Sequence, residues 1–433
     1  MRFWYKITIC LLSIWGGVFL GCTVDSDEDN STKNENVSSE DFITDLPVFG
    51  EDLPVIVIKT DTGEEPTCEL VTPPDGSEGF GIANATILSA RMVIFKNKEV
   101  LYDSGTYNEG EAGITINIRG NSSAWSNKKP YKLKLQKKED LLFRGNNKYY
   151  ADKTWLLIKD ATTLNTVVGL RTADILGFDW TPKYEFVNVV LNNDYKGIYL
   201  LIESIKKKES CVNIDDSGFL IECDTHWWTE DIYFKTDKGR YYTFKHPDIT
   251  DISDEKYEEI KNKINSIEQV ISTDYESILD VQSFAKWLLV HDILSSVDGV
   301  GSNIYIGKYD NTSSTKLFMA TPWDFDWICS IDRVSQWSAI HSSDYFWYLE
   351  LINSNNDNFW RTYKGIWNNT NSTLIENITK GFDVIKENEK TINASRKLDS
   401  ERWDTETRTV EEDMDSMISY FQERIEWLSS VIN

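Results

Sequence analysis

The sequence is short of positive charge and of the residue patterns that build zinc sites. Its 433 residues include 45 Lys and Arg against 70 Asp and Glu, which gives a formal net charge of −25. Nucleic acids bind basic patches, so this balance excludes nucleic acid as a partner. The six cysteines form no Cys-x-x-Cys pair and the four histidines are scattered, which argues against a zinc centre. Basic protein segments, other metal ions and glycans are left as partners.

The first residues have the pattern of an export signal. Arg2 and Lys6 flank the start of an apolar run over residues 7–20, which Leu20-Gly21-Cys22 closes. The run is too short for a permanent membrane helix, which needs about 20 apolar residues. We expect a signal peptide over residues 1–21 and a lipobox whose cleavage leaves Cys22 for diacylglycerol attachment. An ordinary signal peptide with a chance cysteine is the alternative.

Residues 22–50 are expected to form an acidic tether behind the lipidated cysteine. Residues 23–45 contain eight acidic residues and a single basic one, Lys33. Such a stretch buries too little apolar surface to fold. Acidic residues directly after a lipidated cysteine also resemble the signal that sends some Gram-negative lipoproteins to the cell surface, although a plain spacer has the same composition. We therefore expect an exported lipoprotein, anchored to the membrane through Cys22 at the outer membrane or cell surface.

The remaining residues, 51–433, are enough for one large domain or for two lobes that share a cleft. Strands are predicted over residues 53–60, 87–100, 114–119, 131–135 and 155–158, and a hairpin over residues 186–191 and 197–202. Helical periodicity marks residues 163–176, 254–273, 281–294 and most of 345–433. The prediction is an α+β fold, with a strand-rich part over 51–205 and a mainly helical part over 206–433. Cys211 and Cys223 are close enough in sequence for a disulfide.

Two polar residues behind the helix at residues 281–294 have the spacing of a phosphoryl-transfer loop. Asp298 and Asn303 are five positions apart and precede a short predicted strand. In protein kinases an Asp accepts the proton of the substrate hydroxyl, and an Asn five residues later holds a metal ion. The same spacing also suits loop residues that only cap a turn.

Asp324 and Asp326 follow at the distance of a hairpin, so residues 295–327 make a predicted metal-site hairpin. The two carboxylates alternate with aromatic residues at the end of an apolar segment. This setting suits Mg²⁺ or Mn²⁺, because both ions take oxygen ligands. Asp324 is the predicted metal ligand. Asp326 is expected on the same strand face, where it either binds a second ion or supports the site by hydrogen bonding. A buried structural pair is the alternative.

Several segments, taken in order, resemble the CotH family of spore-coat-type atypical protein kinases. Residues 118–123 (IRGNSS) with 128–135 (KKPYKLKL), and then residues 188–199 (NVVLNNDYKGIY) with Glu203, are similar to the family's N-terminal signatures. Residues 283–287 (SFAKW), Asp298, Asn303 and residues 323–326 (WDFD) are similar to its active-site half. The resemblance runs from Leu53 to about Trp367. It implies a kinase-like fold, in which the two parts enclose a cleft.

The resemblance also implies a reaction and a set of roles. A kinase of this family would transfer the γ-phosphoryl group of ATP to a hydroxyl of an unidentified protein, with Mg²⁺ or Mn²⁺ as cofactor. Asp298 would be the catalytic base. Asn303 and Asp324 would hold the metal ion, with Asp326 beside them.

Residues of the strand-rich part would bind the nucleotide. Lys129 or Lys132 would reach the phosphates as a point charge. Arg119 would steady the phosphates or their loop, and Trp323 would complete the nucleotide site from the other part. Glu203 would orient a lysine, unless it is a structural strand carboxylate. The lysines have an alternative of their own, a solvated strand face.

Two features depart from the kinase pattern. No Gly-x-Gly-x-x-Gly loop is present, and Ile328-Cys329-Ser330 stand where family members usually have a Phe-Gly-type ending. Loss of that glycine restricts the backbone, which bears on activity more than on fold. A second class of function is therefore considered. The 16 Trp and 20 Tyr could make a catalytically silent surface adhesin, or a lipoprotein that binds glycans or proteins.

Overall fold

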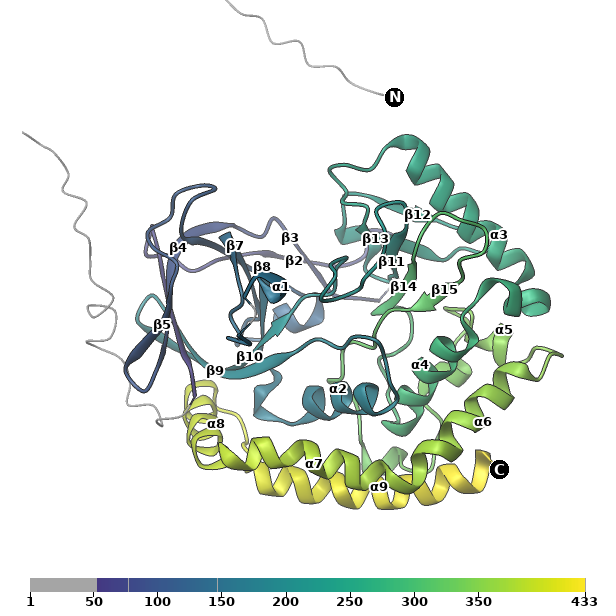
Figure 1. The fold of residues 1–433 in the computed structure, drawn as a ribbon. Helices are drawn as coiled ribbons and strands as arrows, with labels where there is room; N and C mark the ends of the chain where they lie inside the picture. The colour runs from purple at the N-terminus through teal and green to yellow at the C-terminus, as the bar shows by residue number, and fades with distance from the viewer. Residues whose placement is uncertain (1–52, 77, 146, 433) are drawn as a thin grey trace, which may run out of the picture. The chain divides into compact units, whose positions relative to one another are not determined.

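The computed structural model describes residues 53–76, 78–145 and 147–432. The predicted signal peptide, Cys22 and the acidic tether lie outside the described residues. Strands and helices both contribute throughout the described part, so the predicted mixed α and β class is confirmed (Figure 1). None of the described helices combines the length and the apolar character that a membrane span requires.

The larger sheet has eight strands in the order β1-β9-β10-β8-β7-β6-β4-β5. Their bounds are β1 Val55–Thr60, β4 Leu88–Lys96, β5 Glu99–Asp103, β6 Ile114–Ile118, β7 Tyr131–Glu139, β8 Asp152–Ile158, β9 Tyr184–Leu191 and β10 Asp194–Glu203. Strand β1 pairs in parallel with β9 and antiparallel with β4, so the sheet closes on itself. Alternate side chains, Ile56, Ile116, Leu133, Trp155 and Val189 among them, form a buried apolar core. Strands β2 (Glu69–Val71) and β3 (Gly81–Ala83) form a separate pair.

The smaller sheet was largely missed by the sequence-based prediction. Its order is β12-β13-β11-β14-β15, with β11 Phe219–Cys223, β12 Tyr233–Lys235, β13 Tyr241–His246, β14 Ile304–Lys308 and β15 Leu317–Met319. All five residues of β11 are buried. A strand covered on both faces lacks the polar alternation by which a strand is recognised. The part beyond residue 206 is therefore less purely helical than expected.

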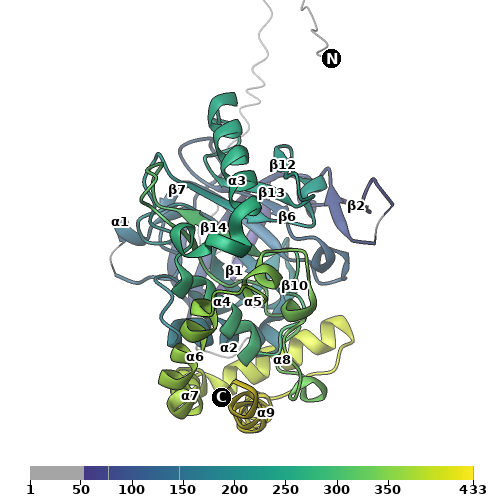
Figure 2. The same ribbon diagram turned by 90° about the vertical axis from the view of Figure 1, so that its right-hand side faces the viewer.

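The helices lie mainly in the second half of the chain. They are α1 Asn147–Tyr150, α2 Asn165–Ile175, α3 Asp254–Ile278, α4 Val281–Ile293, α5 Tyr348–Ile352, α6 Asn358–Thr370, α7 Leu374–Glu387, α8 Glu389–Trp403 and α9 Val410–Ile432. The buried helix α4 contacts α2, α6, α9 and β15. Helices α7 and α9 run side by side, and α7 also packs on α2 (Figures 1 and 2). Trp287, Trp347 and Trp367 are fully buried in this core.

A buried ion pair joins helix α8 to the larger sheet. Lys128 Nζ lies 2.5 Å from Asp399 Oδ2 and also donates to the Ile198 carbonyl at 2.7 Å. The Asp399 carboxylate accepts from the Ile198 backbone N–H at 3.0 Å. Gly197 allows this approach, because a Cβ at that position would lie 2.0 Å from Asp399 Oδ2. The C-terminal helices are thus fixed to β10 by charge as well as by apolar packing.

The four cysteines of the described part are all free. Cys223 is fully buried in β11, where its side chain belongs to the largest apolar core, whereas Cys211 lies in the loop before that strand. The disulfide that the sequence allowed between these two residues is therefore not formed.

Candidate functional site

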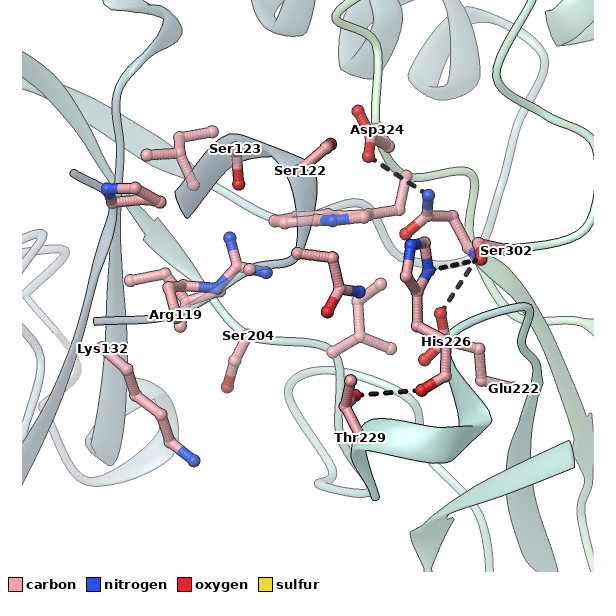
Figure 3. A pocket seen from close by; sticks show the side chains of 18 of the residues that line it. Arg119, Ser122, Ser123, Lys132, Ser204, Glu222, His226, Thr229, Ser302 and Asp324 are labelled. Atoms are coloured by element: carbon pink, nitrogen blue, oxygen red, sulfur yellow. Dashed lines mark hydrogen bonds between the residues drawn. The ribbon is translucent and has the colours of Figure 1, made fainter. Parts of the chain in front are cut away.

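A pocket of about 800 Å³ lies between the larger and the smaller sheet. Residues of β6, β7 and β8 line one wall, and residues of β11, β13 and β14 line the other. Figure 3 shows Arg119 and Lys132 on the first wall, and Glu222, His226, Ser302 and Asp324 on the second. Seven of the residues predicted for the site line this pocket: Arg119, Lys132, Asp298, Asn303, Trp323, Asp324 and Asp326.

The wall formed by the larger sheet carries two cations whose side chains have no ion-pair or hydrogen-bond partner among the described residues. Tyr131 and Leu133 point into the core of the closed sheet, so Lys132 between them faces the pocket. Arg119 follows Ile118, the last core residue of β6, and is half-buried. Within the described residues, neither the Arg119 guanidinium nor the Lys132 ammonium forms an ion pair or a side-chain hydrogen bond. Such a pair of cations suits a phosphate-bearing ligand.

The neighbours of Lys132 affect how readily it carries its charge. Burial lowers the pKa of the Lys132 ammonium, and the positive charges of Lys134 and Lys206 lower it further. An anion bound beside Lys132 would reverse this effect, because it favours the protonated form. The electrostatics of this wall therefore favour an anionic ligand over an empty pocket.

Two predicted nucleotide-binding residues do not line the pocket. The Lys129 ammonium donates to the Ala124 carbonyl at 2.8 Å and so holds the short helical turn Ser122–Trp125. The Glu203 carboxylate accepts from Arg144 Nη1 at 2.7 Å and from the Lys183 backbone N–H at 3.0 Å. Lys132 is thus the member of the predicted lysine pair that reaches the pocket. Glu203 joins Arg144 and the Lys183 backbone, and its carboxylate bonds to no lysine side chain among the described residues.

The second wall brings together Asn303 and Asp324, which come from two different loops. Asn303 Nδ2 donates to Asp324 Oδ2 at 3.2 Å. Both residues have left-handed backbone conformations, with φ of 64° for Asn303 and 66° for Asp324. A non-glycine residue in this region is strained, and such strain is concentrated at functional sites.

The expected strand at residues 318–327 is only partly present. Strand β15 ends at Met319, so Asp324 and Asp326 lie on a turn and the prediction that they share a strand face is wrong. The left-handed conformation of Asp324 breaks the strand geometry. The turn is held from outside, since Asn165 Nδ2 donates to the Asp326 carbonyl at 3.0 Å. Both carboxylates nevertheless reach the pocket.

The carboxyl groups of this wall raise one another's pKa. Burial raises the pKa of Asp324 to about 7, with further contributions from Asp326 and Asp298. Burial and the neighbouring Asp160 raise the pKa of Asp326 to about 6. Burial alone raises the pKa of Asp298. Crowded carboxylates of this kind favour a bound cation, which would restore their charged forms.

The donor set fits a hard divalent cation. Asp324 offers carboxylate oxygens, and the Asn303 carboxamide oxygen beside it has no hydrogen-bond donor among the described residues. Mg²⁺ usually takes one or two protein carboxylates and completes its coordination with water and phosphate oxygens. Nowhere in the described part do three or more His, Cys, Asp or Glu side chains form a ready metal cluster. An ion at Asp324 would therefore depend on ligand oxygens as well.

Several residues of the pocket were missed by the sequence-based reasoning. Glu222 on β11 accepts from the Asn303 backbone N–H at 3.0 Å and pairs with Lys245 at 3.0 Å. Asp224 follows on the same wall, and burial together with Glu222 raises its pKa to about 7. These residues escaped notice because β11 was not recognised as a strand. Asp160, which also lines the pocket and bonds to Thr166, carried no sequence signal beyond its place after a predicted strand.

The segment that departs from the family pattern still contains a residue in the conformation that glycine favours. Cys329 has a φ of 54°. Its backbone N–H donates to the Leu294 carbonyl at 2.8 Å, which ties the segment to the end of α4. A left-handed residue with a side chain is less stable by about 1–2 kcal/mol than glycine there. The backbone at Cys329 therefore adopts the left-handed conformation that glycine favours, although no glycine is present there.

The sequence profile of the CotH kinase protein family matches residues 116–428. The match begins in β6 and ends in α9, so it includes the pocket residues of both walls apart from those around β3. The inner spore coat protein H of Bacillus subtilis (strain 168) is 26% identical over 231 residues, which are 51% of this chain and 59% of that protein. The chain therefore aligns with less than two thirds of this relative's length.

Proposed function

Because the chain belongs to the CotH kinase family, we propose that it is an atypical protein kinase that transfers the γ-phosphoryl group of ATP to a protein hydroxyl. The observation that carries this proposal is the composition of the pocket. Arg119 and Lys132, which form no ion pair with any described residue, line one wall, and the Asn303–Asp324 pair lies on the other wall. The phosphates of ATP need both features, since they are anions that also bind Mg²⁺.

Each residue has a distinct task in the proposed reaction. Arg119 and Lys132 bind phosphate oxygens and orient the γ-phosphoryl group. Asn303 and Asp324 would hold the metal ion that the nucleotide phosphates bind, with Asp326 beside them. A magnesium or manganese ion bound there would neutralise charge on the phosphate oxygens.

Asp298 is the proposed proton acceptor for the substrate hydroxyl. It lines the same pocket, and partial burial of its carboxyl raises its pKa above the ordinary value. A carboxylate of raised pKa is a better general base near neutral pH. Its position in the loop between α4 and β14 leaves it accessible to a protein segment that enters from solvent.

The arrangement of secondary structure supports a kinase-like cleft. Apart from the β2–β3 pair, the described strands before residue 205 form the closed sheet, and most of the helices and the smaller sheet follow it. Residues from both parts line the one pocket that contains Asp298 and Asp324. Protein kinases bind their nucleotide in this way, between a strand-rich and a helix-rich part.

An exported, membrane-anchored location is part of the proposal. The lipobox at Cys22 supports lipidation, and the acidic residues behind it support a position at the outer membrane or cell surface. The name of the Bacillus relative places that protein in the spore coat, which supports a surface-associated role for this chain.

The adhesin alternative has less support. Trp155, Trp287, Trp347 and Trp367 are among the largest fully buried side chains, so they serve the core. Within the described part, Trp327 is the exposed tryptophan. Asp298 and Asp324 also line one pocket, which an adhesin would not require.

The test is a transfer assay on the chain from residue 23 onward, which lacks the signal peptide and the lipid site. It is incubated with ATP labelled on the γ-phosphate, with Mg²⁺ or Mn²⁺ and with a basic protein as acceptor. We expect metal-dependent label on the acceptor or on the chain itself. Absence of label from both would overturn the proposal, whether or not the chain binds ATP.

A further inference from the structure

The position of Asn303 depends on a side-chain lock beyond the ends of two strands. Strands β11 and β14 are antiparallel neighbours, and their last pair is Cys223 opposite Ile304. Past this pair, the chain continues as residues 224–226 on one side and approaches through residues 301–303 on the other. The Thr225 backbone N–H still donates to the Gly301 carbonyl at 2.7 Å. Beyond this backbone hydrogen bond, side chains connect the two segments.

The Ser302 hydroxyl is the centre of the lock. Its oxygen accepts from the Thr225 backbone N–H at 3.2 Å and also contacts the Thr225 hydroxyl. It lies 3.1 Å from His226 Nδ1 and donates to Asp224 Oδ1 at 3.4 Å. Asp224 Oδ1 in turn accepts from the His226 backbone N–H at 2.8 Å. Figure 3 shows Ser302 beside His226, with a dashed line for the contact between the Ser302 hydroxyl and His226 Nδ1.

The backbone on either side of Ser302 needs such support. Gly301 and Asn303 both have positive φ, 95° and 64°. At Gly301 a Cβ would lie 2.7 Å from Thr225 Cγ2, so the two loops are in close contact there. Asn303 is held by its backbone N–H on Glu222 and by its carboxamide on Asp324. Within this turn, Ser302 is the residue whose own side chain bonds to residues 224–226 beyond the neighbouring strand.

We propose that Ser302 and His226 are positioning residues, which hold Asn303 in the orientation that binds the metal–nucleotide complex. The inference rests on the proposed function, because it concerns the same Asn303–Asp324 site. Ser302 acts through the backbone of Asn303, and His226 acts through Ser302. Neighbours that fix the orientation of a metal ligand typically change metal affinity by about 10–100-fold when they are removed.

The geometry excludes a role for Ser302 as an activated nucleophile. In a Ser-His-Asp triad, the serine and the carboxylate bind opposite nitrogens of the imidazole ring. Here Ser302 Oγ and Asp224 Oδ1 both lie beside Nδ1 of His226, at 3.1 Å and 3.8 Å. The Ser302 hydroxyl is also engaged by Thr225, which leaves it no freedom to attack a ligand.

The first test compares Ser302→Ala with Ser283→Ala in the chain from residue 23 onward. Ser283 is a matched control, because its hydroxyl accepts from the Met319 backbone N–H at 3.1 Å and donates to the Asp280 carbonyl at 2.8 Å, outside the pocket. Calorimetry with Mg²⁺ and ATP should show about tenfold weaker binding for Ser302→Ala and less than a twofold change for Ser283→Ala. The unfolding midpoints of both variants in EDTA should fall by similar amounts. Unchanged affinity of Ser302→Ala would overturn the inference.

The second test asks which nitrogen of His226 matters. Asparagine places its amide near the position of Nδ1, and glutamine places it near Nε2. If His226 acts through Ser302, His226→Asn should keep most of the affinity for Mg²⁺ and ATP, and His226→Gln should lose about as much as Ser302→Ala. The reverse order would mean that His226 contacts the ligand directly, which contradicts a positioning role.

The two proposals fail in different ways. Wild-type chain that binds Mg²⁺ and ATP but transfers no phosphate contradicts the kinase and leaves the Ser302 test valid. Wild-type chain that does not bind them contradicts both.

Discussion

Asn303 and Asp324, 21 positions apart in sequence, meet through a hydrogen bond of 3.2 Å from Nδ2 to Oδ2. Each has a left-handed backbone, so two strained residues meet on the same wall of the pocket. Strain of this kind persists where the surrounding structure determines it. Here the surroundings are the Glu222 contact with Asn303 and the turn fixed by Asn165. The pair is therefore the natural place to test the proposed chemistry.

Asp324 and Asp298 should differ when each is replaced. Asp324→Ala should abolish phosphate transfer and weaken Mg²⁺-dependent ATP binding, because it removes the proposed metal ligand. Asp298→Asn should lower the transfer rate by about 10²–10⁴ and leave ATP binding nearly intact, since a general base acts on the acceptor hydroxyl. Transfer assays and calorimetry on both variants measure the two effects. Undiminished ATP binding by Asp324→Ala would show that Asp324 holds no metal.

The stability of the metal-free protein should depend on pH through Asp324. Its pKa is about 7 in the folded protein, against 3.8 ordinarily, so the folded state binds the extra proton between these values. Stability contributed by this group is therefore lost as pH rises from about 4 to 7. Asp324→Asn avoids the loss and should be more stable than wild type by about 1–3 kcal/mol at pH 8, with little difference at pH 4.

Urea denaturation in EDTA at the two pH values measures this difference. The exposed Asp332, replaced by Asn, is the control and should behave as wild type at both values. A wild-type protein that is as stable as Asp324→Asn at pH 8 would contradict the raised pKa.

Arg119 and Lys132 should bind ATP through charge. Arg119→Gln and Lys132→Met should each weaken ATP binding about tenfold or more, because a hydrogen bond to a charged group contributes about 1.5–3 kcal/mol. Both substitutions should weaken the binding of AMP less than that of ATP, because AMP has fewer phosphates. Lys129→Met is the matched control, since Lys129 supports the turn at Ala124 and does not line the pocket. If Lys129→Met weakens ATP binding as much as Lys132→Met, the assignment of Lys132 is wrong.

Local patterns explain what could be predicted from the sequence. The hairpin turn at Asn192 and Asn193 was expected from its residues, and both have the positive φ of a tight hairpin, 50° and 66°. Helices α2, α3 and α4 lie within a few residues of their predicted bounds. The CotH resemblance, carried by short motifs, is confirmed by the family match. In each case, the feature is determined by residues that are close together in the sequence.

Long-range features could not be predicted from one sequence. The larger sheet closes through the parallel pairing of Val55 with Asn188, which no local pattern encodes. Strand β11 is buried on both faces and therefore resembled an irregular segment, so Glu222 and Asp224 were missed. The sequence could not decide whether Lys129 or Lys132 binds the phosphates, because the lysine that faces the pocket depends on where β7 begins.

The proposed lipid anchor depends on Cys22. Cys22→Ala should move the full-length protein from the membrane fraction to the soluble fraction, because the thiol that carries the lipid anchor is lost. Fractionation and labelling with a radioactive fatty acid measure the two consequences. Cys10, within the apolar run, is the matched control, and Cys10→Ala should keep both the label and the membrane location. Unchanged membrane partitioning of Cys22→Ala would rule out the anchor.

The Lys128–Asp399 pair should contribute strongly to stability, because both side chains are buried. Asp399 also accepts from the Ile198 backbone, and its loss would leave the Lys128 ammonium buried without a counter-charge. Removal of one partner of a buried pair typically destabilises by about 3–5 kcal/mol. We expect Asp399→Ala to lower the free energy of unfolding in urea by this amount.

The double variant Lys128→Met, Asp399→Leu should recover much of this loss, since apolar side chains of similar size remove the unpaired charge. Glu376→Ala, which removes the exposed pair with Lys380, is the control and should give no measurable change. If the double variant were as unstable as Asp399→Ala, the loss would arise from packing of α8 against β10 and not from the buried charge. The ion pair would then be a consequence of the helix position and not one of its causes.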